Sequence, residues 1–247
     1  MAEEMRRDPK TFFLCTDAPG PLLDALATVG PLAVSRYNLG MALVQAGGHE
    51  EAAKSFGASA ADYRSLGQMQ SAWDAELQRL APLAALGRGQ EIEAQADQLQ
   101  AALAEGGDIP TSLVGGDADE ERLEELRGEL WFELGAARYA LGEHEGSLAA
   151  YLRALRAWQA LRRRTLEGQT HYAMAAPRMA TNRFDEAYAD LLRALRVAVE
   201  RSDSSSMIAI GQQLRSVEAL IDDAGQHLPV VPEDLREALE RVRMFGN

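Results

Sequence analysis

The residues that could support catalysis or bind a metal are few, and their spacing does not assemble a site. The histidines His49 and His144 follow equivalent glycine-containing turns, which marks them as turn residues. Neither His171 nor His227 has a glutamate or a second histidine three or four residues further on, as a helical zinc site requires. The single cysteine, Cys15, has no base near it in the sequence. The sequence therefore predicts neither a catalytic centre nor a metal centre.

An acidic, glycine-rich segment, Glu105–Glu120, is the remaining candidate for metal chemistry. Its acidic side chains include Asp108, Asp117, Asp119 and Glu120. Carboxylate oxygens suit Ca²⁺, but these residues lack the regular ligand order of a calcium loop. No glycine pattern in the chain follows a strand and opens a helix, so no phosphate-binding or dinucleotide-binding loop is predicted. We expect a protein that is not an enzyme and has no cofactor.

Composition narrows the class of protein further. The 247 residues carry a formal net charge of −13 and include one cysteine. A single cysteine excludes a disulfide-stapled scaffold, and an acidic chain is poorly suited to the phosphates of nucleic acids. The apolar runs are shorter than the ~18 residues that a membrane span needs, and Met1–Lys10 is too polar for a signal peptide. We predict a cytoplasmic protein that binds neither nucleic acid nor membrane.

The periodicity of apolar residues predicts an almost wholly helical chain. Between Gly30 and Phe245 apolar residues recur three or four positions apart, the spacing of one helix face. The one strand-like stretch, Thr11–Thr16, is short and is followed by Pro and Gly. We therefore predict an all-α fold.

Internal repeats explain the length of the chain. Four segments align, and the aligned register positions are Leu39, Arg79, Leu134 and Met174. The first and third steps both span 40 positions, and the middle one spans 55, which equals 40 plus an insertion of 15 within Glu105–Glu120. A further step of 40 reaches Leu214 in another apolar-periodic stretch. A fixed period of this size is typical of stacked helix pairs, so we predict about five of them.

Each strong copy of the repeat has residues suited to a close helix pair. Gly40 and Gly135 lack a side chain and allow close approach of a neighbouring helix, while Gly47 can adopt the positive φ that ends a helix. The aromatic residues Phe56 and Tyr151 follow Gly40 and Gly135 by 16 positions and are suited to fill the space between helices.

This pattern resembles the tetratricopeptide repeat, in a longer form than the common one, as found in bacterial regulators and scaffold proteins. The resemblance covers Ala33–Ser202. It implies a right-handed superhelical solenoid of antiparallel helix pairs and a concave face that binds a protein or peptide. The common period is about 34 residues, and the period in this chain exceeds it, so we expect an extra turn in the second helix of each pair.

The repeats divide the chain into an N-terminal extension, a repeat array and a C-terminal closure. We expect the extension or cap at 1–30, repeats at 31–69, 70–104, 121–164 and 165–203, the insertion at 105–120, and a divergent repeat with capping helices at 204–247. The apolar segment Thr11–Thr16 has three alternative roles, which are to cap the array, to fill its groove or to exchange with a second chain.

If the first helix of each pair lines the concave face, as the resemblance implies, its inward residues form an apolar groove. The candidate groove residues are Tyr37, Met41, Val44, Leu77, Phe132, Tyr139, Tyr172 and Met179. Aromatic and Met side chains at such a surface suit an amphipathic or extended apolar segment of a partner. Two alternatives remain: half of these residues are core, or the chain is a regulatory sensor for a small peptide or apolar ligand, acting as a homodimer.

Positive charge is concentrated in one part of the acidic chain. Residues 151–201 contain ten arginines and five acidic residues. The densest cluster, Arg162–Arg164, could bind an acidic partner or a phosphate. The alternative is that these arginines pair with neighbouring carboxylates on a solvated helix face.

Overall fold

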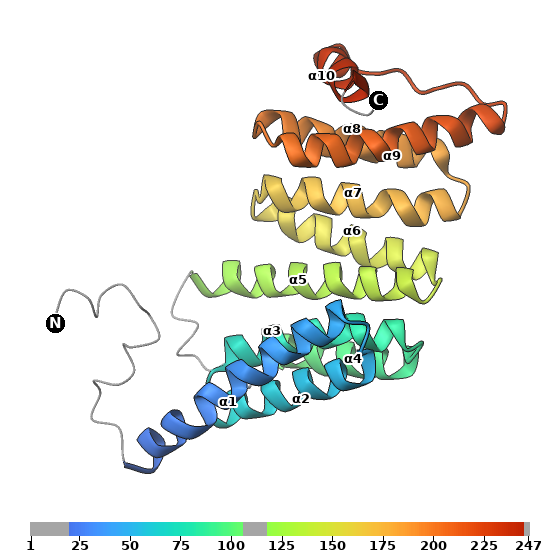
Figure 1. Ribbon diagram of the computed structural model, residues 1–247. Helices are drawn as coiled ribbons and strands as arrows, with labels where there is room; N and C mark the ends of the chain where they lie inside the picture. The colour runs from blue at the N-terminus through green and yellow to red at the C-terminus, as the bar shows by residue number, and fades with distance from the viewer. Residues whose placement is uncertain (1–19, 106–117, 245–247) are drawn as a thin grey trace. The chain divides into compact units, whose positions relative to one another are not determined.

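The computed structural model of the chain describes residues 20–105 and 118–244 (Figure 1). These residues form ten α-helices and no strand, so the all-α prediction is confirmed. The predictions for Thr11–Thr16 and Cys15, and for a calcium site that includes Asp108 and Asp117, fall outside the described residues. None of the described helices is long and apolar enough to cross a membrane.

Seven of the connections between consecutive helices are three residues long. The helices are α1 (Gly20–Gln45), α2 (His49–Ser65), α3 (Met69–Ala85), α4 (Gly89–Glu105), α5 (Ala118–Ala140), α6 (His144–Ala160), α7 (Arg164–Ala180), α8 (Phe184–Glu200), α9 (Ser204–Asp223) and α10 (Glu233–Met244). The pairs α3/α4 and α7/α8 consist of two 17-residue helices. The added length of the repeat is therefore not confined to the second helix, and that expectation was wrong.

A single left-handed residue ends most of the helices. These residues are Gly47, Gly67, Gly87, Gly142, Arg162, Asn182, Ser202 and Gly225. At the first of them, Gly47 donates to the carbonyl of Val44 (3.1 Å) and Gly48 donates to that of Leu43 (2.8 Å). This bonding pattern satisfies carbonyls at the end of one helix. Except after Gly225, the next helix begins two residues after the left-handed position, so each of these turns reverses the chain within three residues.

The chain divides into two compact units, residues 1–82 and 83–247, and the boundary lies within α3. In the first unit α1 and α2 pack as a helical hairpin through Gly40. A Cβ atom at Gly40 would lie 2.8 Å from the ring of Phe56, so only glycine lets this ring approach so closely. Tyr37 packs edge-on against Phe56, with ring centroids 5.6 Å apart. Ser59 donates to the carbonyl of Ala33 (2.8 Å).

In the second unit α5 and α6 repeat the same contacts. A Cβ atom at Gly135 would lie 2.7 Å from the ring of Tyr151, and Phe132 packs edge-on against that ring at 5.5 Å. Ser147 donates to the carbonyl of Gly135 (2.7 Å). The two segments that align best in sequence therefore form the same local structure.

The third aligned copy, in α7 and α8, uses a different pair of side chains. Ala175 takes the position of Gly135, and Leu191 takes the position of Tyr151. Both are buried, with 1% and 0% of their surface exposed. The alanine is larger than the glycine by one methyl group, and the leucine is smaller than the tyrosine. The two differences compensate each other, so the volume of the pair is balanced.

Within the second unit, consecutive helices from α5 to α9 lie side by side in a stack, and α10 covers its end (Figure 1). The core of α7 to α10 contains fully buried Tyr188, Leu195 and Leu214. α10 packs directly on Gly211, where a Cβ atom would lie 1.7 Å from Val242. The C-terminal residues thus cover apolar surface of α8 and α9 that would otherwise be exposed.

Candidate functional site

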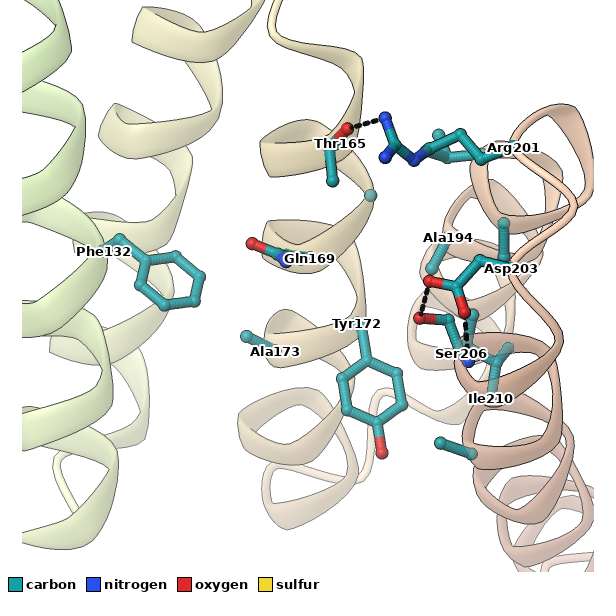
Figure 2. Close-up of a pocket in the computed structure, with 14 residues that line it drawn as sticks. Phe132, Thr165, Gln169, Tyr172, Ala173, Ala194, Arg201, Asp203, Ser206 and Ile210 are labelled. Atoms are coloured by element: carbon teal, nitrogen blue, oxygen red, sulfur yellow. Dashed lines mark hydrogen bonds between the residues drawn. The ribbon is translucent and has the colours of Figure 1, made fainter. Parts of the chain in front are cut away.

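The second unit contains an open apolar pocket between α7 and α9, with α8 as its floor and α5 at one edge (Figure 2). We call it the α7–α9 pocket, and its volume is about 310 Å³. The residues that line it are Phe132, Thr165, Gly168, Gln169, Tyr172, Ala173, Ala194, Val197, Ala198, Arg201, Asp203, Ser206, Ala209 and Ile210. This volume lies at the lower end of the ~300 to 1,000 Å³ that small-ligand sites occupy.

Small side chains create the hollow. Four lining residues are alanines, and they come from three helices: Ala173 from α7, Ala194 and Ala198 from α8, and Ala209 from α9. Gly168 of α7 allows α7 to pack closely on α8, the floor of the pocket, because a Cβ atom at this position would lie only 2.9 Å from Val197 of α8. Close approach of α7 to α8, together with short side chains on the facing helices, leaves space that larger residues would fill.

Two aromatic side chains form the apolar walls. Phe132 projects from α5 toward α7, and Tyr172 lies on α7 itself (Figure 2). The Phe132 ring is held by its edge contact with Tyr151. Tyr172 packs against the core of α7 to α10. Both rings are therefore positioned by the fold before any ligand arrives, which lowers the conformational entropy lost on binding.

Polar groups gather at the other end of the pocket. Arg201 donates to the Thr165 hydroxyl (2.5 Å) across the opening between the α8–α9 turn and α7 (Figure 2). Asp203 is the N-cap of α9 and accepts from the Ser206 backbone N–H (3.1 Å), the Ser206 hydroxyl (2.7 Å) and the Ser205 hydroxyl (2.7 Å). These hydrogen bonds, led by that from the Ser206 side chain, lower the pKa of Asp203 to about 2.

The Asp203 carboxylate therefore caps α9 and is not a candidate for binding a ligand. It stays ionised at neutral pH, and hydrogen bonds from its own first turn occupy both of its oxygens. Arg201 presents a charged group beside an otherwise apolar pocket. The arrangement can bind an apolar group and place an acceptor on that group near Arg201.

Of the predicted groove residues, the structure brings together Phe132 and Tyr172 in the α7–α9 pocket. Tyr139 is 39% exposed and lies with its ring centroid 5.6 Å from that of His144. Met179 packs against the core of α7 to α10. Neither Tyr139 nor Met179 lines this pocket.

The predicted groove residues in the first unit have mixed environments. Met41 is 38% exposed, whereas Leu77 is 5% exposed and belongs to the core. Val44 is partly buried, and Tyr37 packs on Phe56. Leu77 is therefore a core residue and not a surface residue of a groove.

The predicted arginine patch is largely paired. Arg163 lies 3.4 Å from both Glu121 and Glu125, and Arg164 lies 3.2 Å from Glu167. Arg162 is exposed and occupies the left-handed position of the α6–α7 turn, with φ of 54°. These neighbours match the alternative that the arginines pair with nearby carboxylates.

Sequence reasoning missed the contributions of α8 and α9 to the pocket. It considered only the first helices of the first four pairs, and the alanines of α8 look like ordinary packing residues in a periodic pattern. Clusters of small residues on facing helices are the signal that could have indicated a hollow. In the described part of the chain, no group of three or more His, Cys, Asp or Glu side chains is placed to hold a metal ion.

The fold and the pocket together define an all-α protein of repeated helical hairpins that carries an open apolar pocket. Comparison with protein-family models finds no match to this chain, and comparison with curated proteins finds no significant relative.

Proposed function

We propose that the chain is a non-catalytic, cytoplasmic peptide-binding scaffold of the tetratricopeptide-repeat type. In this proposal the helix pairs stack as a right-handed superhelical solenoid with a concave face. The regular repeat period supports it, as do the matching contacts of Gly40 with Phe56 and of Gly135 with Tyr151. Stacked helix pairs use extended inner surfaces to bind other proteins.

The observation that carries this proposal is the α7–α9 pocket. We infer that it takes one large apolar side chain of an amphipathic or extended partner segment, which then runs along the neighbouring helices. Burial of such a side chain contributes about 1.5–3 kcal/mol, and the preformed position of Phe132 and Tyr172 reduces the entropic cost. The partner residue next to the anchor would offer an acceptor, such as a backbone carbonyl, to Arg201.

A second candidate function is a regulatory sensor that binds a small apolar ligand, acting as a homodimer. The same pocket favours it, because a volume of about 310 Å³ is enough for a small molecule. Native mass spectrometry of the purified full chain distinguishes the sensor from the peptide-binding scaffold. A bound small molecule that survives purification supports the sensor, and a protein that carries no such mass supports the peptide scaffold.

The peptide proposal is tested by selection from a displayed library of random peptides on the full-length chain. Selected peptides should share one large apolar residue. Two substitutions, Ala173→Leu and Ala209→Leu, add bulk from opposite walls of the pocket, and each should weaken binding about tenfold or more. Ala180→Leu is the matched control, because Ala180 is an exposed residue of α7 that does not line the pocket.

Retention of full affinity by both filled variants would show that the selected peptides bind elsewhere. Circular dichroism of each variant at the working temperature checks that the helices remain folded. Failure of the library to yield any peptide that depends on the pocket would count against the scaffold.

A further inference from the structure

A second cavity in the same unit is polar, and the proposed peptide site makes no use of it. Its volume is about 460 Å³, and it lies among α6, α7 and α8. It is lined by Leu152, Leu155, Gln159, Arg164, Glu167, His171, Met174, Arg178, Asp190, Arg193, Arg196 and Val197. Four arginines and one histidine therefore meet two carboxylates around one cavity.

The carboxylate of Asp190 organises this cavity. Asp190 is fully buried, with 0% of its surface exposed. Its Oδ1 lies 2.9 Å from His171 Nδ1 and 2.9 Å from Arg193 Nη1, and its Oδ2 lies 3.1 Å from Arg178 Nε. An ionised carboxylate is this deeply buried only where partners compensate its charge. Oδ1 is hydrogen-bonded, whereas Oδ2 lies at ion-pair distance from Arg178 Nε with no hydrogen bond between the two atoms, so the arginine compensates the charge of this oxygen without donating to it.

The second lining carboxylate is also engaged. Glu167 is buried and lies 3.2 Å from Arg164 Nη1. Acidic residues outside the lining hold three of the arginines at the rim: Glu186 lies 3.2 Å from Arg178, Glu200 lies 3.9 Å from Arg164, and Asp234 lies 3.0 Å from Arg196. The acceptors at this cavity are therefore used by groups of the protein.

The hydrogen-bond donors that line this cavity have fewer partners within the protein than the carboxylates have. Arg193 has a side chain that is 54% exposed and forms one ion pair, from Nη1 to Asp190, among the described residues. Its Nε and Nη2 groups carry the remaining N–H donors of the guanidinium fork. His171 uses Nδ1 toward Asp190, and its Nε2 donates to a further partner in the imidazolium form, which carries a proton on both ring nitrogens. The amide of Gln159, an exposed residue of α6, adds a donor from a third helix.

We propose that this cavity binds the phosphate group of a small organic phosphate. Arg193 makes the main contact through its N–H groups, with Gln159 and His171 contributing from the neighbouring helices. Asp190 is a positioning residue that fixes His171 and Arg193 and does not touch the ligand.

The arrangement of the donors favours phosphate over carboxylate. Gln159 lies on α6, His171 on α7 and Arg193 on α8, so the donors surround the cavity instead of forming one flat edge. A tetrahedral oxyanion presents acceptors in several directions, whereas a planar carboxylate is matched by a single guanidinium fork.

Titration of the full-length chain with inorganic phosphate and with O-phosphoserine, followed by calorimetry, tests the assignment. We expect one saturable site for both, and acetate should bind more weakly by at least about tenfold. Arg193→Gln should weaken phosphate binding about tenfold or more, because it removes a charge-assisted contact. Arg236→Gln is the matched control, since Arg236 is a 58% exposed arginine of α10 paired with Glu233 and does not line the cavity.

Gln159→Ala is a second variant that leaves the Asp190 cluster intact and should weaken binding severalfold. Circular dichroism at the titration temperature checks the fold of each variant. The proposal is overturned by the absence of saturable phosphate binding up to about 10 mM, by equal affinity for acetate, or by Arg193→Gln and Arg236→Gln having the same small effect.

Discussion

The ring of Tyr151 occupies the space where Gly135 would carry a side chain, since a Cβ atom at Gly135 would lie 2.7 Å from Tyr151 Cδ1. The contact fixes α5 against α6 and places Phe132, which packs on the same ring at 5.5 Å. Phe132 in turn forms one wall of the α7–α9 pocket. A glycine in the core of a helix pair is therefore connected through two rings to the candidate binding site.

We predict that Gly135→Ala lowers the free energy of unfolding by up to about 2 kcal/mol. Overpacking of a core costs about 1–3 kcal/mol, and the higher helix propensity of alanine returns about 1 kcal/mol of that. Urea denaturation of the full chain measures the change. Gly57→Ala is the control, because Gly57 lies within α2 and a Cβ atom there would have its nearest neighbour 3.7 Å away, so this variant should be slightly stabilised.

The double variant Gly135→Ala, Tyr151→Leu extends this test. It reproduces the Ala175 and Leu191 pair of the next repeat, so its loss of stability should be smaller than the sum of the two single losses by about 1 kcal/mol. Strict additivity would mean that the two positions are not coupled through this contact.

The sequence predicted the helical class and the equivalent copies because both depend on local, repeated features. Apolar spacing indicates helices, and both strong copies place a glycine at the same distance before an aromatic residue. The left-handed turn at Gly47 was predicted for the same reason. The left-handed turn at Arg162 was not, because arginine has no intrinsic preference for positive φ and only the register of the neighbouring helices imposes it there.

The candidate site was predicted less well, since cavities depend on side chains from several helices. Phe132 and Tyr172 were predicted as groove residues and do line the pocket. Leu77 was also predicted there but is buried, because a shift of one position on a helix moves a residue by about 100° from surface to core. The contact of His171 with Asp190 joins residues 19 positions apart and has no signature in either helix alone.

The turn between α6 and α7 offers a stabilising substitution. Arg162 has φ of 54°, a region in which a residue with a Cβ atom is disfavoured by roughly 1–2 kcal/mol. It is exposed and forms no ion pair with any described residue. Arg162→Gly should therefore raise the free energy of unfolding by about 0.5–1 kcal/mol, after allowance for the greater freedom of glycine in the unfolded chain.

Urea denaturation measures this gain as a higher midpoint. Asn182→Gly at the equivalent turn, with φ of 58°, should give a smaller gain, because asparagine tolerates the left-handed region better than arginine does. A lower midpoint for Arg162→Gly would show that its side chain has a stabilising role in this turn.

The N-cap of α9 makes the free energy of unfolding depend on pH in the acidic range. Hydrogen bonds from Ser206 and Ser205 lower the pKa of Asp203 from 3.8 to about 2 in the folded chain. A carboxyl group whose pKa is lower in the folded state stabilises that state above its unfolded pKa, and the contribution is lost as pH falls through the folded pKa. The cap should therefore act fully above about pH 4 and fade as the pH falls toward 2.

Asp203→Ala should lower the melting temperature at pH 7 by a few degrees, because it removes an N-cap. The difference between this variant and the native chain should shrink between pH 4 and pH 2. Asp222→Ala, an exposed position at the other end of α9, should not lower the melting temperature at pH 7. A difference that stays constant over this pH range would contradict the assigned role of the ionised carboxylate.

The buried carboxylate of Asp190 provides the most severe test of the α7–α8 packing. Asp190→Ala leaves Arg178, whose side chain is 13% exposed, without the partner at 3.1 Å that it has inside the protein. Removal of one member of a buried ion pair costs about 3–5 kcal/mol, and we expect a loss in this range by urea denaturation. Adding Arg178→Met should recover part of the loss, because it removes a buried guanidinium that would keep only the half-exposed Glu186 as an ion-pair partner, and it keeps an apolar chain of similar length. If the single and double variants were equally unstable, the loss would come from packing around α8 and not from the guanidinium that lost Asp190.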